Sequence, residues 1–190
     1  DLQVRPVTGD FLSLDGLPDG VGEGRKIGFF PGSTIGNLTP DEAVAFLTGA
    51  RRLLGEDALF VLGVDLVKGP ETLIAAYDDA RGVTAAFNRN LLVRANRELG
   101  ADFDVEAFAH LAVWNPIASR MEMHLQATRP MTVTIGDRRI DFARGETIHT
   151  ENSRKFTEAS VRELASASGW RVAKFREGGA PSVALALLES

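Results

Sequence analysis

The chain has 190 residues, of which 44% are hydrophobic and 25% are charged, and its formal net charge is −5. This globular composition, without any run of Lys or Arg, argues against a nucleic-acid partner, and no apolar run is long enough to cross a membrane. The absence of cysteine excludes disulfides, thiolate zinc sites and cysteine nucleophiles, and it fits the cytoplasm, where we expect the protein to reside. Because the chain opens on Asp1, we expect a fragment of a longer protein.

The first third of the chain predicts a βαβ unit. Residues 26–30 (KIGFF) form a short apolar run typical of a buried strand. Thr39 is a suitable N-cap and Pro40 a suitable first residue for a helix that ends at Gly55. Residues 58–67 (ALFVLGVDLV) are continuously apolar and predict a central strand of a parallel sheet.

The middle of the chain predicts a mixture of helices and strands. Residues 71–80 and 83–99 resemble two helices divided by a glycine, and residues 104–110 a further short helix. Four strands follow, with the sequences HLAVW, MEMHLQAT, MTVTIG and RIDFARG. Residues 145–156 (GETIHTENSRKF) form a polar segment before the next helix, and this segment is too long to be only an N-cap cluster.

The end of the chain predicts a helix over residues 157–168 and a hairpin of strands 170–177 and 182–189, joined by Gly178-Gly179-Ala180-Pro181. Two α/β pieces, 1–67 and 156–190, therefore flank an inserted α+β block, 68–155. A βαβ unit that is followed by a helix and a terminal β-hairpin resembles the end of the sheet in class I methyltransferases.

The loop from Pro31 to Leu38 (PGSTIGNL) is a candidate binding loop. Ligands bind beyond the carboxyl ends of strands in open parallel sheets, and glycine lets the backbone approach a ligand closely. Asn37 can both donate and accept hydrogen bonds. A tight strand-to-helix turn explains the same residues equally well.

Four further positions each have a structural and a functional interpretation. Asp10 and Phe11 could hold an adenine, although a strand-end acid beside a core phenylalanine is the more common arrangement. Asp65 could face a cleft or cap the next element. Tyr77, the only tyrosine in the chain, could be a core residue or a ligand contact.

No metal site is expected from the spacing of the three histidines, His110, His124 and His149, which lack the i, i+4 pattern of a zinc helix. Over residues 119–125, Met121 and Met123 point to one side of the predicted strand, and Arg120, Glu122 and His124 point to the other.

Several long strings identify the chain as a member of the histidine-specific, S-adenosylmethionine-dependent methyltransferase family by resemblance. They are GDF, FFPGSTIGN, GVDLVKGPETLIAAYDDARGVTAAFNRNLL, NRELGADFD, SRMEMHL and GETIHTENSRKF, in this order. The resemblance implies a class I, Rossmann-like α/β fold that is truncated at its N-terminus, with residues 68–155 as an inserted substrate-binding domain. It also implies methylation of the α-amine of L-histidine, the first step of ergothioneine biosynthesis, with S-adenosylhomocysteine as the second product.

The resemblance also implies a role for ten residues. Asn37 holds the amine and carboxylate end of histidine, Tyr77 the carboxylate, and Glu151 with Ser153 the imidazole nitrogens. No residue acts as an acid or base, because the protein mainly positions the reactants. The substrate-binding residues are Gly32, Thr34, Asn37, Tyr77, Thr84, Met121, Glu151 and Ser153, and the cofactor-binding residues are Asp10 and Phe11.

Two features depart from the family pattern. Arg154 and Phe156 stand where tyrosines are expected, and the chain has no glycine-rich first βα turn. We therefore expect the chain to be inactive by itself and able to self-associate, and the full-length protein to be a monomer. The alternatives are a methyltransferase of the same family that acts on another amine or amino acid, and a non-catalytic interaction domain.

Overall fold

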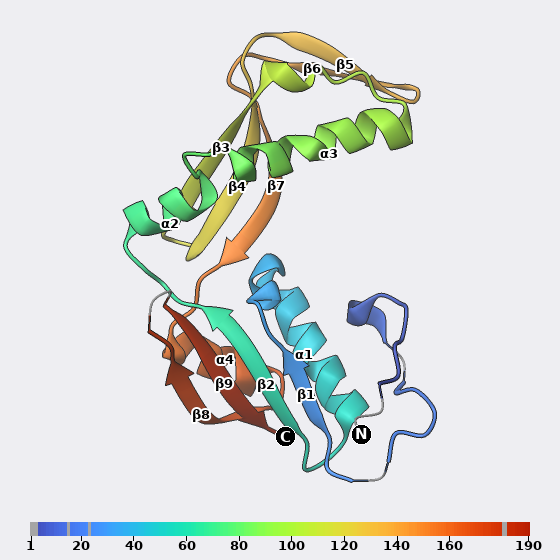
Figure 1. Ribbon diagram of the computed structural model, residues 1–190, viewed down its shortest axis with the longest axis vertical. Coiled ribbons are helices and arrows are strands. Elements are labelled where there is room, and N and C mark those ends of the chain that lie inside the picture. Colours follow the sequence, from blue (N-terminus) through green and yellow to red (C-terminus); the bar gives the residue numbers. More distant parts are fainter. Residues whose placement is uncertain (1–3, 15, 23, 180–181) are drawn as a thin grey trace. The chain divides into compact units, whose positions relative to one another are not determined.

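The computed structural model describes residues 4–14, 16–22, 24–179 and 182–190, and the chain divides into two compact units (Figure 1). Unit 1 comprises residues 1–67 and 155–190, and unit 2 comprises residues 68–154. The chain returns to unit 1 at residue 155, one residue before residue 156, where the sequence predicts this return.

Unit 1 contains a four-stranded sheet in the order β1-β2-β9-β8. β1 is parallel to β2, and β9 is antiparallel to both β2 and β8. The expected hairpin is therefore confirmed, although Ala180 and Pro181 of its turn lie outside the described residues. The strands are β1 (Ile27–Phe30), β2 (Leu59–Asp65), β8 (Arg171–Glu177) and β9 (Val183–Glu189).

Two helices accompany this sheet, α1 (Pro40–Leu54) and α4 (Glu158–Ala167). Each begins with a capping box, in which the N-cap threonine accepts from the N3 backbone and the N3 side chain pairs with the N-cap backbone. The helices bury apolar side chains against the sheet in a single core. Its members include Ile35, Leu47, Leu62, Phe156, Val161 and Trp170.

Unit 2 contains an antiparallel three-stranded sheet in the order β3-β4-β7 and a separate hairpin, β5-β6. In β4 every second residue is buried, which confirms the two faces predicted around Met121 and Met123. The helices of this unit pack against β3 and β4. The elements are α2 (Pro70–Tyr77), α3 (Val83–Leu99), β3 (Phe108–Asn115), β4 (Arg120–Ala127), β5 (Met131–Ile135), β6 (Arg138–Phe142) and β7 (Thr147–Arg154).

The structure corrects two predictions in unit 2. The helix expected over residues 104–110 is only a 3₁₀ turn, η3 (Val105–Ala107), because Phe108 is fully buried and already pairs with Ala127 in the sheet. The polar segment 145–156 is mostly a strand, β7. Its side chains are too polar to give an alternating apolar pattern, but its backbone hydrogen bonds are made with β4.

None of the helices in the described part of the chain is long and apolar enough to cross a membrane.

Candidate functional site

The loop between β1 and α1 is fixed to the end of β2 in unit 1. The Asp65 N–H donates to Ser33 Oγ over 2.9 Å, and Ser33 itself has a left-handed backbone, with φ of 59°. The next residues form the 3₁₀ turn η2 (Thr34–Asn37), in which the Gly36 N–H donates to the Ser33 carbonyl. The loop therefore has a defined conformation rather than being an open connection.

Gly63 in β2 allows this loop to lie close to the strand. A Cβ atom at Gly63 would lie 3.1 Å from Pro31 Cα and 3.2 Å from the Gly32 nitrogen, both of which are backbone atoms that cannot move away cheaply. Asn37 is exposed, and its side chain makes no hydrogen bond to another described residue. Its amide is thus available to a ligand.

Asp65 forms a buried ion pair. Lys155 Nζ lies 2.9 Å from Asp65 Oδ2, and the Lys155 side chain is 1% exposed. The sequence leaves open whether Asp65 faces a cleft or caps the next element, and it does not single out Lys155. A lysine in a polar segment is normally assigned to the surface, so the sequence carries no signal for this pair.

Asp10 and Phe11 lie at the short turn η1 (Phe11–Ser13) in unit 1. The Asp10 carboxylate accepts a hydrogen bond from the Leu12 N–H over 2.9 Å, which caps the turn. The Phe11 ring lies 5.6 Å from the ring of Phe30 and 5.8 Å from that of Phe46, and it lines an apolar cavity of about 310 Å³. Asp10 caps a turn instead of ending a strand, and Phe11 is 44% exposed, so the pair differs from a strand-end acid beside a core phenylalanine.

Tyr77 and Ser153 are brought together in unit 2. The Tyr77 hydroxyl, at the end of α2, donates to Ser153 Oγ on β7 over 2.7 Å. Ser153 is opposite Met121 in the register of β4 and β7, and Glu151 is opposite Met123. Directly opposed residues share a face of a sheet, so these side chains belong to one face.

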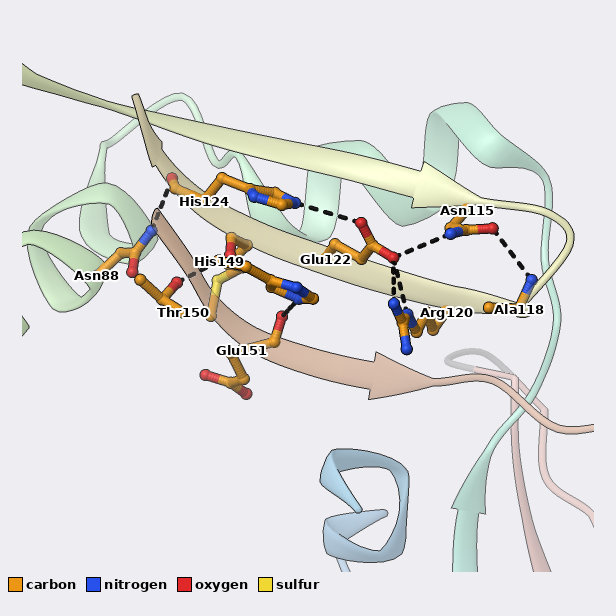
Figure 2. Close-up of polar contacts among 10 residues, drawn as sticks. Asn88, Asn115, Ala118, Arg120, Glu122, His124, His149, Thr150 and Glu151 are labelled. Atoms are coloured by element: carbon orange, nitrogen blue, oxygen red, sulfur yellow. Dashed lines mark hydrogen bonds and ion pairs between the residues drawn. The ribbon is translucent and has the colours of Figure 1, made fainter. Parts of the chain in front are cut away.

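A β-bulge decides which residues of β7 share that face. Glu151 pairs with Met123, but the next pair along β4 is His124 with His149, so Thr150 is the extra residue. The Thr150 hydroxyl donates to the Met123 carbonyl over 2.9 Å (Figure 2). Strict alternation would put His149 on the same side as Glu151, whereas the bulge moves His149 to the opposite face.

Thr84 lies in the first turn of α3, directly after a turn that Asp79 stabilises. The Asp79 carboxylate accepts hydrogen bonds from the N–H groups of Thr84 at 2.8 Å and Val83 at 3.1 Å. These bonds, first that of Thr84, lower the pKa of Asp79 to about 2. Gly82 has φ of 68° in the same turn, which glycine adopts without steric cost.

The opposite face of the unit 2 sheet holds a polar cluster of Glu122, His124 and His149 (Figure 2). The imidazole rings are stacked with centroids 4.6 Å apart, and His124 Nε2 lies 3.2 Å from Glu122 Oε2. Asn115 and Arg120 donate to Glu122 Oε1. Burial tends to raise the pKa of Glu122, but these hydrogen bonds outweigh it and hold the pKa at about 2.

Glu122, His124 and His149 each offer one ligand atom, and these atoms all lie within 4.8 Å of one another. The sequence does not reveal this cluster, because its members come from two strands whose register depends on the bulge.

The whole chain, residues 1–190, matches the family model described as histidine-specific methyltransferase, SAM-dependent. The chain belongs to this family. Among curated relatives, histidine N-alpha-methyltransferase of Mycobacterium tuberculosis is 46% identical over 90% of this chain and 54% of its own length. The enzyme of the same name from Mycolicibacterium smegmatis is 47% identical over 87% of this chain and 52% of its own length. This family member therefore spans about half the length of those relatives.

A more distant relative, ergothioneine biosynthesis protein 1 of Neurospora crassa, is 28% identical over 73% of this chain and 16% of its own length. Among solved structures, the CcbJ methyltransferase of Streptomyces caelestis covers 97% of this chain and 67% of its own, with 18% identity and a TM-score of 0.49.

Proposed function

We propose that the protein containing this chain transfers methyl groups from S-adenosylmethionine to the α-amine of L-histidine. The observation that carries the proposal is the shared face of Tyr77, Met121, Glu151 and Ser153 in unit 2, since the family resemblance assigns these four residues to substrate binding. Family membership and the names of the two mycobacterial relatives support the same substrate and methyl donor.

The chemistry requires positioning more than proton transfer. The amine nitrogen forms a bond to the methyl carbon as the carbon–sulfur bond of the sulfonium breaks, and the nitrogen releases a proton to solvent. Only a neutral amine has the lone pair for this attack. A nearby carboxylate would favour the ammonium form, whereas an amide such as Asn37 can accept a hydrogen bond without adding negative charge.

Discrimination between substrates is assigned to Glu151 and Ser153. A carboxylate and a hydroxyl can accept from and donate to the two nitrogens of an imidazole ring. A side chain that lacks these nitrogens would not make the hydrogen bonds that Glu151 and Ser153 are proposed to make with imidazole, and its transition state would be bound less tightly. Histidine is therefore expected to be a better substrate for this face than an apolar amino acid.

The substrate can be tested directly with the full-length protein. Incubation with isotopically labelled S-adenosylmethionine and a panel of amino acids and simple amines, followed by mass spectrometry, should give methylated histidine as the main product. Methylation of another amine instead would favour the alternative enzyme, and no methylation of any acceptor would favour a non-catalytic interaction domain.

The role of Glu151 gives a second test. Because its carboxylate is proposed to contact the imidazole and not the cofactor, Glu151→Ala should raise the KM for histidine at least about tenfold and leave the KM for S-adenosylmethionine nearly unchanged. Thr147→Ala is a suitable control, since Thr147 is an exposed residue of the same strand. Equal losses for both substrates would show that Glu151 has a structural role.

A further inference from the structure

Asn88, near the middle of α3, is a fully buried polar residue. Its Nδ2 atom lies 3.0 Å from His110 Nδ1 and 3.1 Å from the backbone carbonyl of His124. A carbonyl can only accept, so this side-chain atom must be the amide nitrogen, and both of its hydrogens are used. Asn88 therefore connects helix α3 to two strands, β3 and β4.

His110, on β3, continues the connection to the end of α2. Its Nε2 atom lies 2.8 Å from the backbone carbonyl of Tyr77. This carbonyl also only accepts, so Nε2 carries a hydrogen, and Nδ1 must accept from Asn88. Only the neutral Nε2–H tautomer satisfies both hydrogen bonds, and Asn88 selects that tautomer.

Tyr77 is consequently held at both ends. It is the last residue of α2, where carbonyl groups have no partner within the helix, and His110 supplies one. At the other end of the residue, the hydroxyl donates to Ser153. The backbone of Tyr77 is thus tied to β3 and its side chain to β7.

We propose that Asn88 and His110 are positioning residues that hold the Tyr77 ring in place, so that its hydroxyl, which here donates to Ser153, can turn its one hydrogen toward the substrate carboxylate. Only the function of Tyr77 in this proposal rests on the proposed histidine methyltransferase activity. The positioning itself is a property of unit 2. Simple packing does not account for the arrangement, because apolar residues of similar shape could fill the same space without the need to satisfy buried polar groups.

The first experiment exploits the fact that Tyr77 is the only tyrosine among the 190 residues. The chain labelled with 3-fluorotyrosine should show one ¹⁹F resonance, which reports on Tyr77 alone. His110→Phe removes the donor to the Tyr77 carbonyl but keeps a buried ring, and it should shift or broaden this resonance. His110→Gln can keep an N–H near the position of Nε2, so the resonance should stay near its original position.

A matched control lies one residue away on the same helix. Arg89 Nε donates to the Phe108 carbonyl over 2.9 Å, so it also joins α3 to β3, but it does not lead to Tyr77. Arg89→Met should leave the fluorotyrosine resonance unchanged. An unchanged resonance in both His110→Phe and Asn88→Leu, or an equal change in Arg89→Met, would overturn the proposal. If His110→Phe does not fold, Asn88→Leu replaces it. Asn88→Leu should then shift or broaden the fluorotyrosine resonance, whereas His110→Gln should leave it near its original position.

The second experiment measures steady-state kinetics on the full-length protein. His110→Phe should raise the KM for histidine by about tenfold, whereas the KM for S-adenosylmethionine should change less than about twofold. A similar loss of apparent affinity for both would indicate a general structural defect and would overturn the positioning role. If the wild-type protein does not methylate histidine, the proposed function fails, but the ¹⁹F measurement still tests the positioning of Tyr77.

Discussion

Lys155 combines a positive charge with almost complete burial, since its side chain is 1% exposed and its Nζ lies 2.9 Å from Asp65 Oδ2. Removal of one partner from a buried ion pair leaves the other charge poorly solvated. We therefore expect Lys155→Met to lower the free energy of unfolding by about 3–5 kcal/mol, measured by denaturant titration.

An exposed pair provides the control for Lys155. Arg94 and Glu98 form an i, i+4 ion pair on α3 in which both side chains are about half exposed. Arg94→Met should change the free energy of unfolding by less than about 1 kcal/mol. Similar effects for the two substitutions would mean that the Lys155–Asp65 pair is not significant for stability.

Glu122 should make stability depend on acid pH. Its pKa in the folded chain is about 2, below the ordinary value of 4.5, so folding favours the ionised carboxylate. The stabilisation is complete above about pH 4.5 and is lost as the pH falls toward 2. Wild-type stability should therefore decrease more steeply than that of Glu122→Gln between pH 5 and pH 2, measured by urea unfolding at each pH; parallel curves would contradict this.

At the scale of single residues, the sequence indicated the residues proposed to contact ligands but not the residues proposed to hold them in position. Tyr77, Glu151 and Ser153 lie in strings that resemble a family, so they could be named before any coordinates. Asn88 and His110 could not, because one lies on a helix and the other on a strand, and only the packing of α3 against the sheet brings them within 3.0 Å.

Helix α1 shows how local sequence can determine an element completely. Thr39 accepts from the Glu42 N–H, and the Glu42 carboxylate accepts from the Thr39 N–H over 2.8 Å. Thr39→Ala removes the first of these bonds and should lower the free energy of unfolding by about 1 kcal/mol, measured by chemical denaturation.

The same substitution in the middle of this helix serves as its control. Thr48 is an exposed interior residue of α1, where alanine is the better helix former. Thr48→Ala should therefore be neutral or slightly stabilising. A loss of stability at Thr48 as large as that at Thr39 would indicate that the hydroxyl group contributes in some way other than capping.

Strand β7 shows the opposite case at the scale of elements. Its residues, TIHTENSR, have neither the apolar alternation of a strand nor the spacing of a helix, and they were expected to form a polar segment. They form a strand because β4 offers an antiparallel partner along the segment, interrupted by the bulge at Thr150. Long-range pairing therefore overrides weak local preference here.

At the scale of the whole chain, one exposed sheet edge should control association. Among the described residues β1 pairs only with β2, and its side chains Ile27 and Phe29 are 62% and 68% exposed. An apolar, unprotected edge can pair with another chain. We expect concentration-dependent self-association of this chain, and we expect Phe29→Lys to reduce it, as measured by light scattering.

The other edge of the sheet is a natural comparison. Strand β8 carries Arg171, Lys174 and Arg176, and charges of this kind discourage edge-to-edge pairing. Leu99→Lys, which adds the same charge at an exposed apolar position in unit 2, should leave association unchanged. A wild-type chain that stays monomeric at high concentration would exclude the association itself.

The sequence by itself determined the βαβ unit, the terminal hairpin, the family and the residues proposed to contact histidine, because caps, apolar runs and motif strings are local properties. Only the tertiary structure decided that residues 147–154 are a strand, that Lys155 is buried against Asp65, and that a bulge separates His149 from Glu151. These features depend on strand pairing and burial between distant segments, and no local pattern of residues encodes them.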